Sequence, residues 1–183
     1  MMPVVLRTQR LVLDAPLSSD LDAIVEYCRD PLFEHFMTLP WPYEPQHASV
    51  FIDQLVPNGW ASGTELTWAL REREGGPLLG AIGWRADGND LGYWVGAPHR
   101  GSGYMTEAVV AVADYLFGTL GLASIAWECV VGNTASAGVA RAAGFRFTGS
   151  AASRLTFRDG SHKLSWHGVL TADDRERKPG WPA

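Results

Sequence analysis

The chain has 183 residues, of which 46% are hydrophobic and 19% are charged, and its formal net charge is −5. This composition is typical of one globular domain, since disordered chains are poorer in apolar residues and two domains usually need more residues. The acidic balance argues against nucleic-acid binding, and no apolar run approaches the ~20 residues that span a bilayer.

The first third of the chain is predicted to contain one strand and two helices. The segment QRLVLDAP alternates weakly and favours a strand that ends at Pro16. Ser18 or Ser19 is a suitable N-cap for a helix that stops before Pro31. The proline-rich residues 40–45 indicate a loop, and a second helix is expected over residues 45–56.

The rest of the chain is predicted to alternate strands with helices. Three strands are expected first, and Gly75 and Gly76 indicate a hairpin between the first two; the ranges are 65–74, 77–86 and 89–97. Later strands are expected at 124–131, 145–150 and 163–170, and helices at 105–120 and 134–143. This order predicts an α/β domain over residues 1–170, with a mixed sheet and helices on both faces, followed by a polar tail at 171–183.

A glycine-rich segment, APHRGSGYMTEA at residues 97–108, connects a predicted strand to the longest predicted helix. The first N–H groups of a helix have no internal partner and carry partial positive charge, so this position suits an anion. Gly101 and Gly103 let a ligand approach the backbone closely, and Arg100 adds positive charge. A plain strand-to-helix turn is the alternative. A Walker A loop is excluded because no Gly-Lys-Ser/Thr is present, and a dinucleotide fingerprint because Thr106 replaces its last glycine.

Four segments of the chain together resemble the GCN5-related N-acetyltransferases (GNAT superfamily), and most closely the RimJ/RimL-type branch, which acetylates the N-termini of ribosomal proteins. In chain order these are LRTQRLVL, LGYWVGAPHRGSGYMTEAVVAVADYLFGTLGL, NTAS and AAGFRFTG. The resemblance extends over residues 6–170 and is most specific over 91–149. It implies the GNAT acyl-CoA N-acyltransferase fold, whose central, mostly antiparallel sheet is splayed between the fourth and fifth strands.

The resemblance also implies acetyl-CoA as cosubstrate, with no metal. The family signature Arg/Gln-x-x-Gly-x-Gly/Ala falls on residues 100–105, although Met105 departs from its last position and narrows the space beside the loop. Val95 is expected to pair its backbone with the pantetheine arm. The residues whose backbone N–H groups are expected to hold the pyrophosphate are Arg100, Gly101, Ser102, Gly103, Tyr104 and Met105.

Catalytic roles are implied for residues on the other side of the expected opening. Asn133 is expected to contact pantetheine, and Ser136 to contact it and protonate the departing sulfur; the alternative is that they only cap the helix at 134–143. Glu128 lies in an otherwise apolar strand and is either the general base, acting through water, or a paired structural residue. Tyr93 and His99 are weaker candidates.

Cys129 raises the possibility of an acetyl-cysteine intermediate. A lone strand cysteine without a histidine nearby in the sequence is usually part of the core, so direct transfer in a ternary complex is predicted. The segment FEHFMTLPWPYEP lies where the resembling branch builds its acceptor pocket. Phe36, Trp41 and Tyr43 are therefore expected to line this pocket, with ordinary packing as the alternative.

The predicted function is an acetyl-CoA-dependent N-acetyltransferase that acts on a primary amine, either a protein N-terminal α-amine or a small-molecule amine. A catalytically weak acyl-CoA-binding sensor or partner subunit is the alternative. The protein is expected to be a monomer or homodimer, with no nucleic-acid or membrane partner. A cytoplasmic location is expected because the first residues do not form a signal peptide, and Cys28 and Cys129 show no metal or redox spacing.

Overall fold

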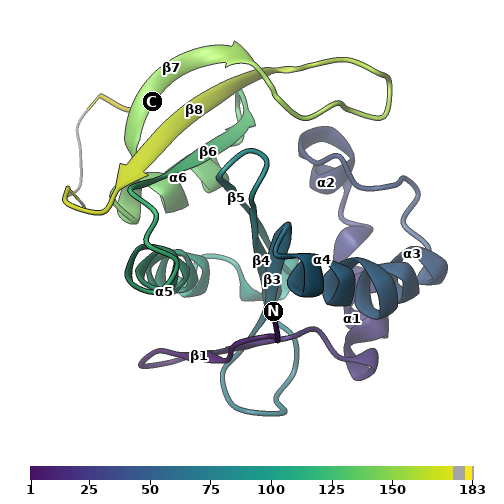
Figure 1. The fold of residues 1–183 in the computed structure, drawn as a ribbon. Coiled ribbons are helices and arrows are strands. Elements are labelled where there is room, and N and C mark those ends of the chain that lie inside the picture. The colour runs from purple at the N-terminus through teal and green to yellow at the C-terminus, as the bar shows by residue number, and fades with distance from the viewer. Residues whose placement is uncertain (175–179, 183) are drawn as a thin grey trace.

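The computed structural model describes residues 1–174 and 180–182. Within these residues, eight strands form one mixed sheet in the order β1-β2-β3-β4-β5-β6-β8-β7 (Figure 1). The strands are β1 Leu6–Arg7, β2 Val12–Asp14, β3 Glu65–Arg71, β4 Gly80–Arg85, β5 Asp90–Val95, β6 Ser124–Val130, β7 Arg146–Ala152 and β8 Leu164–Thr171.

The sheet is splayed between β5 and β6, which are the fourth and fifth strands of the sequence prediction. These two strands run parallel, and their pairing is confined to Asp90–Ala126 and Leu91–Trp127. The other neighbouring strands pair antiparallel. Beyond Leu91 the two strands therefore diverge and leave the remaining edge of β5 unpaired. The predicted mixed, mostly antiparallel and splayed sheet is confirmed.

Helices cover both faces of the sheet, as predicted. Figure 1 shows α5 on one side of β3–β5 and α1 and α3 on the other. The helical segments are η1 Ser18–Asp20, α1 Leu21–Cys28, α2 Pro31–Phe36, α3 Pro45–Val50, η2 Phe51–Leu55, α4 Val56–Ser62, η3 Ala97–His99, α5 Tyr104–Gly118 and α6 Thr134–Ala142. In the described chain, no helix is both long and apolar enough to cross a membrane.

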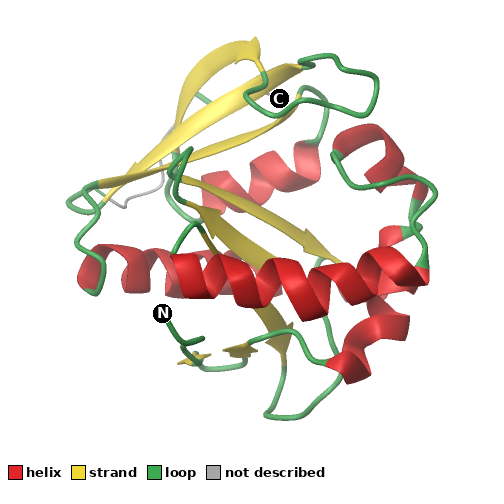
Figure 2. Cartoon of the chain, turned by 45° about the vertical axis from the view of Figure 1, so that its right-hand side comes forward, coloured by secondary structure: helices red, strands yellow, loops and turns green. Residues whose placement is uncertain are grey.

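The second predicted helix is longer than expected, because it does not stop at residue 56. It continues through η2, a π-helical turn, into α4 and ends at Ser62 (Figure 2). Pro57 has no N–H to donate to Asp53 four residues earlier, and the Val56 N–H instead donates five residues back to Phe51 O. The wider turn accommodates the proline, so the helix continues to Trp60, which packs edge-on against Trp68 at 5.0 Å between ring centroids.

A short helix, α2, occupies residues that the sequence prediction left without regular structure. Asp30 is its N-cap, since Oδ1 accepts a hydrogen bond from Leu32 N at 2.9 Å, and Pro31 takes the first helical position. The hairpin predicted at Gly75 and Gly76 is also looser than expected, because β3 ends at Arg71 and β4 begins at Gly80.

The chain end packs on the sheet where it is described. Trp181, in the segment expected as a polar tail, lies 5.4 Å from Trp127 and 5.6 Å from Phe147 between ring centroids. Its indole N–H donates to Phe145 O at 3.2 Å. Residues 175–179 and 183 of that expected tail lie outside the described residues.

Candidate active site

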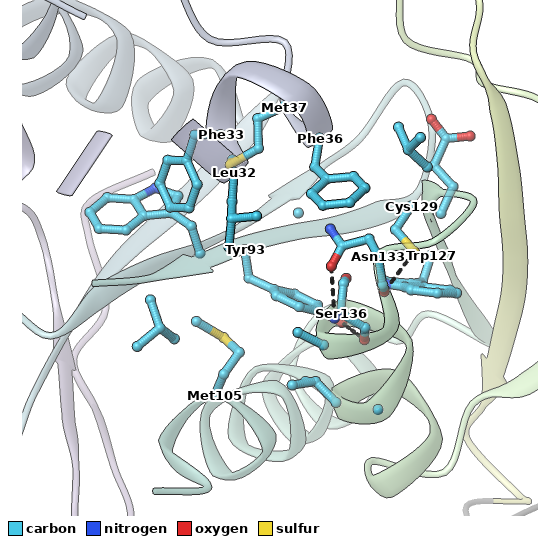
Figure 3. A pocket seen from close by; sticks show the side chains of 18 of the residues that line it. Leu32, Phe33, Phe36, Met37, Tyr93, Met105, Trp127, Cys129, Asn133 and Ser136 are labelled. Carbon is cyan, nitrogen blue, oxygen red and sulfur yellow. Dashed lines mark hydrogen bonds between the residues drawn. The ribbon is translucent and has the colours of Figure 1, made fainter. Parts of the chain in front are cut away.

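A cavity of about 850 Å³ opens where β5 and β6 diverge (Figure 3). Its walls come from β5, the glycine loop, the start of α6, β6, α2 and the segment between β7 and β8. The predicted site residues that line it are Phe36, Val95, Arg100, Gly101, Gly103, Tyr104, Met105, Glu128, Asn133 and Ser136. The weaker candidates Tyr93 and His99, together with Cys129, line it as well.

The glycine loop takes a backbone conformation that favours glycine at two positions. Gly101 and Gly103 have φ values of 78° and 77°, in the left-handed region that other residues rarely adopt. Gly103 is the N-cap of α5, and no side chain caps this helix. The N–H groups of the first turn are therefore available to an anion at the edge of the cavity.

Arg10, which was not among the predicted site residues, anchors this loop to the N-terminal segment. Its Nη1 donates to Ser102 O at 3.0 Å, its Nε donates to Glu107 Oε2 at 2.6 Å, and its guanidinium lies 5.1 Å from the ring centroid of Tyr104. Burial alone would raise the pKa of Glu107, but hydrogen bonds from Thr8 and Arg10 together lower it. Ser102 is not among the residues that line the cavity, since the loop holds it against Arg10.

The β5 edge that faces the cavity carries backbone groups that no strand pairs, although Val95 O accepts from the Arg100 side chain. Gly96 N donates to Leu79 O at 2.9 Å on the β4 side. Because successive residues of a strand point their backbone groups to opposite edges, the N–H and C=O of Val95 and Tyr93 point toward the opening. A ligand in the opening can therefore pair with Val95 as an added strand would.

Arg100 is held by the elements around it. Its Nη2 lies 2.7 Å from Asp30 Oδ2, its Nε donates to Val95 O at 3.2 Å, and its guanidinium is 5.7 Å from the centroid of Phe33. The side chain thus connects the glycine loop to the N-cap of α2, and the backbone N–H of Arg100 makes a long hydrogen bond of 3.4 Å to Ala97 O.

Asn133, Ser136 and Tyr93 form one hydrogen-bonded group at the start of α6 (Figure 3). Asn133 Oδ1 accepts from Ser136 N at 3.1 Å, so Asn133 caps α6, as the structural alternative predicts. Ser136 Oγ donates to Tyr93 Oη at 3.3 Å, and Tyr93 Oη donates to Ser136 O at 2.9 Å. Burial raises the pKa of Tyr93 above its ordinary value, so its phenol stays protonated and keeps this orientation.

Cys129 has the properties of a core thiol. Its Sγ donates to Asn133 O at 3.6 Å, and burial raises the pKa of the thiol to about 12. At neutral pH the sulfur is therefore protonated and a poor nucleophile.

Glu128 borders the cavity and is also paired. Its Oε1 accepts from Ser153 Oγ at 2.8 Å, and its Oε2 accepts from Arg154 N at 3.1 Å and lies 3.5 Å from His167 Nδ1. The side chain is only 8% exposed. These contacts, which the sequence did not reveal, hold the carboxylate in one orientation beside the cavity.

The end of the cavity near α2 is apolar. Figure 3 shows Phe36 and Met37 facing Asn133 and Ser136 across the hollow. Leu155 and Phe157, from the segment between β7 and β8, line the same cavity and were not predicted. No metal site accompanies them, since the described residues hold no group of three His, Cys, Asp or Glu side chains placed to bind an ion.

Two of the three predicted acceptor-pocket residues lie elsewhere. Trp41 and Tyr43 do not line the cavity. Tyr43 is 4% exposed and packs in a second apolar cluster with Ile24 and Ile52, beside His47. Burial there raises the pKa of its phenol. The formation of α2 shortens this segment and directs Phe36 alone of the three toward the opening.

The splayed sheet, the uncapped helix after a glycine loop and the cavity between them define an acetyltransferase. Residues 10–146, which are more than half of the chain, match the acetyltransferase (GNAT) domain. The chain therefore belongs to the GNAT family, and it is an N-acetyltransferase.

Similar proteins support this assignment. An uncharacterized N-acetyltransferase, p20, from Bacillus licheniformis is 26% identical over 136 residues, which cover 72% of this chain and 76% of p20. A candidate ribosomal-protein-serine acetyltransferase from Vibrio cholerae has a TM-score of 0.79 at 24% identity, covering 93% of this chain and 99% of that one. Mycobacterium smegmatis RimJ, solved with CoA-disulfide, has a TM-score of 0.75 at 19% identity, covering 93% and 87%. The resemblance to the RimJ/RimL-type branch is confirmed at the level of the fold.

Proposed function

We propose that this N-acetyltransferase uses acetyl-CoA and transfers the acetyl group directly to a primary amine in a ternary complex. The observation that carries the proposal is that one cavity joins the uncapped start of α5, the free edge of β5, Ser136 and Glu128. A CoA thioester needs the first two features, and amine acetylation needs a proton acceptor and a proton donor.

The chain offers a suitable set of contacts for CoA. Backbone N–H groups of residues 100–105 would hold the pyrophosphate, because the helix start is positive and Gly103 presents no side chain there. The Val95 N–H would donate to an amide carbonyl of pantetheine, and Val95 O, which accepts from Arg100 Nε, also faces the opening. Asn133 keeps its amide nitrogen free of the helix cap, since only Oδ1 accepts from Ser136 N.

Two proton movements are assigned to this chain's side chains. A protonated amine must first lose a proton, which Glu128 accepts through water. The neutral nitrogen then attacks the thioester carbonyl, the C–S bond breaks, and the sulfur takes a proton from Ser136 Oγ. The proton that the attacking nitrogen loses as the amide forms returns through water to Ser136 Oγ, which restores the hydroxyl. An acetyl-cysteine route is disfavoured because the Cys129 thiol, with its pKa raised to about 12 by burial, is protonated at neutral pH.

The acceptor is proposed to be a protein N-terminus or a small-molecule amine. The Vibrio cholerae relative is named for acetylation of a ribosomal protein, which favours the first. The apolar end of the cavity suits an acceptor with an apolar group next to its amine, whether this is a protein N-terminus or a small molecule. A cytoplasmic location and a monomeric or homodimeric state stay predictions.

Thiol release tests the proposal. Acetyl-CoA binding is measured by calorimetry, and free CoA is then followed with a panel of N-terminal peptides and small amines. Amine-dependent CoA release, with saturation by both substrates, is the expected result. Tight acetyl-CoA binding without release for any amine would favour the sensor, and the absence of binding would contradict both functions.

A further inference from the structure

The loop between β7 and β8, residues 153–163, is tied to α2 by two cationic side chains. Arg158 Nη1 donates to Met37 O at 3.2 Å and to Leu39 O, and Nη2 donates to Glu34 O. Lys163 Nζ donates to His35 O at 2.7 Å. Figure 1 shows this loop extending from the β7–β8 pair toward α2.

These contacts provide hydrogen-bond donors for carbonyl groups at the C-terminal end of α2. The helix has six residues, and the carbonyl groups of its last turn lack partners within the helix. Cationic donors are favourable at such an end, and the planar guanidinium of Arg158 can serve several carbonyls at once. The contacts are therefore a defined docking of two elements that are more than 100 residues apart in sequence.

The loop itself is ordered from base to tip. At the base, Ser153 N donates to Lys163 O at 2.8 Å, and Ser153 Oγ donates to Glu128. At the tip, Phe157 N donates to Ser161 O at 2.9 Å, and Asp159 Oδ1 accepts from Ser161 N at 2.9 Å. Phe157 is 6% exposed and lies under Lys163 Nζ, 4.6 Å from its ring centroid. The base of the loop is thus held at Glu128, and its tip is held against α2 by Arg158 and Lys163.

Both partners of this docking supply walls of the same cavity. Leu32, Phe36 and Met37 come from α2 and the residue after it, and Leu155 and Phe157 come from the loop. Arg158 itself is exposed and does not line the cavity. Any influence of Arg158 on the reaction must therefore act through the spacing of these apolar walls.

We propose that Arg158 is a specificity-determining residue, which fixes the width of the acceptor end of the cavity by tying the β7–β8 loop to α2 and so selects primary amines with a compact apolar group. The proposal rests on the proposed function, because it assigns the apolar end to the acceptor. Glu128 lines the cavity and is hydrogen-bonded to Ser153 at the base of the loop. The amine is therefore placed next to Glu128, and its apolar group between Phe36 and Phe157.

The test compares Arg158→Ala and Arg158→Lys with the wild type and with Arg7→Ala. Arg7 is the control because its ion pair with Glu74 is exposed and lies outside the cavity. The acceptors are 2-phenylethylamine and the bulkier 2,2-diphenylethylamine. We expect Arg158→Ala to raise the KM for 2-phenylethylamine about tenfold, with kcat and acetyl-CoA affinity nearly unchanged, since a wider pocket contacts the apolar group less closely and loses binding that ground state and transition state share. The preference for the compact amine should shrink, and Arg158→Lys should restore part of it.

Hydrogen exchange gives a readout that needs no acceptor. Amides in residues 153–163 and in α2 should exchange faster in Arg158→Ala than in the wild type or in Arg7→Ala. Unchanged exchange would overturn the docking role, and faster exchange with an unchanged amine preference would overturn the specificity role. A wild type that acetylates other amines but neither probe would overturn the acceptor class. A protein that fails to bind acetyl-CoA would instead reject the proposed function, while exchange still reports on Arg158.

Discussion

Gly103 adopts a positive φ at the start of α5 and places no charge beside the proposed phosphate site. Substitutions can separate these two properties. Its φ of 77° favours glycine, but Asn and Asp tolerate this region better than other residues. A Cβ at this position would meet only Arg10 Nη2, at 3.5 Å, which is ordinary contact. Asn and Asp therefore form a matched pair that differs in charge and hardly in shape.

We expect Gly103→Asp to weaken acetyl-CoA binding at least about tenfold more than Gly103→Asn. Two like unit charges about 4 Å apart repel by about 4 kcal/mol at an effective dielectric constant near 20, and solvent at this open site reduces that value. Calorimetric titration measures both affinities, and circular dichroism checks that both variants fold. Equal losses in the two variants would show that backbone strain, and not phosphate repulsion, is the cause, and would remove the pyrophosphate from this loop.

Ser136 is proposed to protonate the departing sulfur, and its substitution by Ala should remove the hydroxyl without disturbing α6. Asn133 caps α6 through the backbone N–H of Ser136, so the cap survives when Oγ is removed. We expect Ser136→Ala to lower kcat by ~10²–10⁴-fold, the usual contribution of general acid catalysis, with a much smaller change in acetyl-CoA affinity.

Tyr93→Phe is the companion variant for Ser136. It removes the hydroxyl that accepts from Ser136 Oγ and donates to Ser136 O. A smaller loss than in Ser136→Ala would assign Tyr93 to holding the serine in place. Wild-type turnover in Ser136→Ala, measured by thiol release with a saturating amine, would take Ser136 out of the mechanism.

At the scale of whole elements, the sequence predicted those segments whose periodicity is strong and whose ends carry clear signals. The helix expected at 105–120 is α5 at Tyr104–Gly118, and the helix expected at 134–143 is α6 at Thr134–Ala142. The splay of the sheet came from the resemblance, because periodicity alone does not say which neighbouring strands separate. The Asp30-Pro31 pair was a readable start signal for α2, an N-cap followed by proline at the first helical position, and it was overlooked.

Contacts between distant segments could not be read from the chain. Arg158 reaches the end of α2, and Ser153 and Arg154 reach Glu128, across more than 20 residues of intervening sequence in each case. Nothing in the local pattern of the β7–β8 loop distinguishes these residues from solvated surface. Trp41 and Tyr43 were expected in the pocket because the resembling branch builds it from this segment, but of the three only Phe36, in α2, lines the cavity.

Glu128, in β6, is hydrogen-bonded to this loop, so it can be either the general base or an anchor of the loop. The pH dependence of two variants distinguishes these roles. If Glu128 is the general base, Glu128→Gln should lose most activity below the pKa of the acceptor amine, where the amine is protonated. That pKa is ~7.7–8 for an α-amine and ~10.4 for an alkyl amine. Activity relative to the wild type should then rise with pH, as free amine becomes abundant.

Ser153→Ala is the control, because it removes the hydrogen bond to Glu128 Oε1 and keeps the carboxylate. Its loss should be equal at every pH if it only disturbs the loop. Should Glu128→Gln show the same flat profile of kcat/KM, Glu128 anchors the loop and is not the base.

For the molecule as a whole, the narrow connection between the two parts of the sheet is the main structural consequence of the splay. β5 and β6 share two residue pairs. Next to them, Arg154 connects the β7–β8 loop to the β4–β5 turn through Gly88 O at 2.8 Å and Asp90 Oδ1 at 3.6 Å. Past this closed end β5 and β6 do not pair, so a cosubstrate bound there as we propose would join the two parts as a strand does.

Acetyl-CoA should therefore stabilise the fold and protect particular amides at the same time. At a free concentration about 100 times Kd, ligand binding raises the free energy of unfolding by about 2.7 kcal/mol, and urea denaturation with and without acetyl-CoA measures this change. The stabilisation should be much smaller in Gly103→Asp. Hydrogen exchange locates it: the Val95 amide faces the opening and should exchange readily without ligand and slowly with it, whereas the Gly96 amide, bonded to Leu79 O, should be protected in both states. Stabilisation that leaves Val95 unprotected would mean that acetyl-CoA binds without lying along β5.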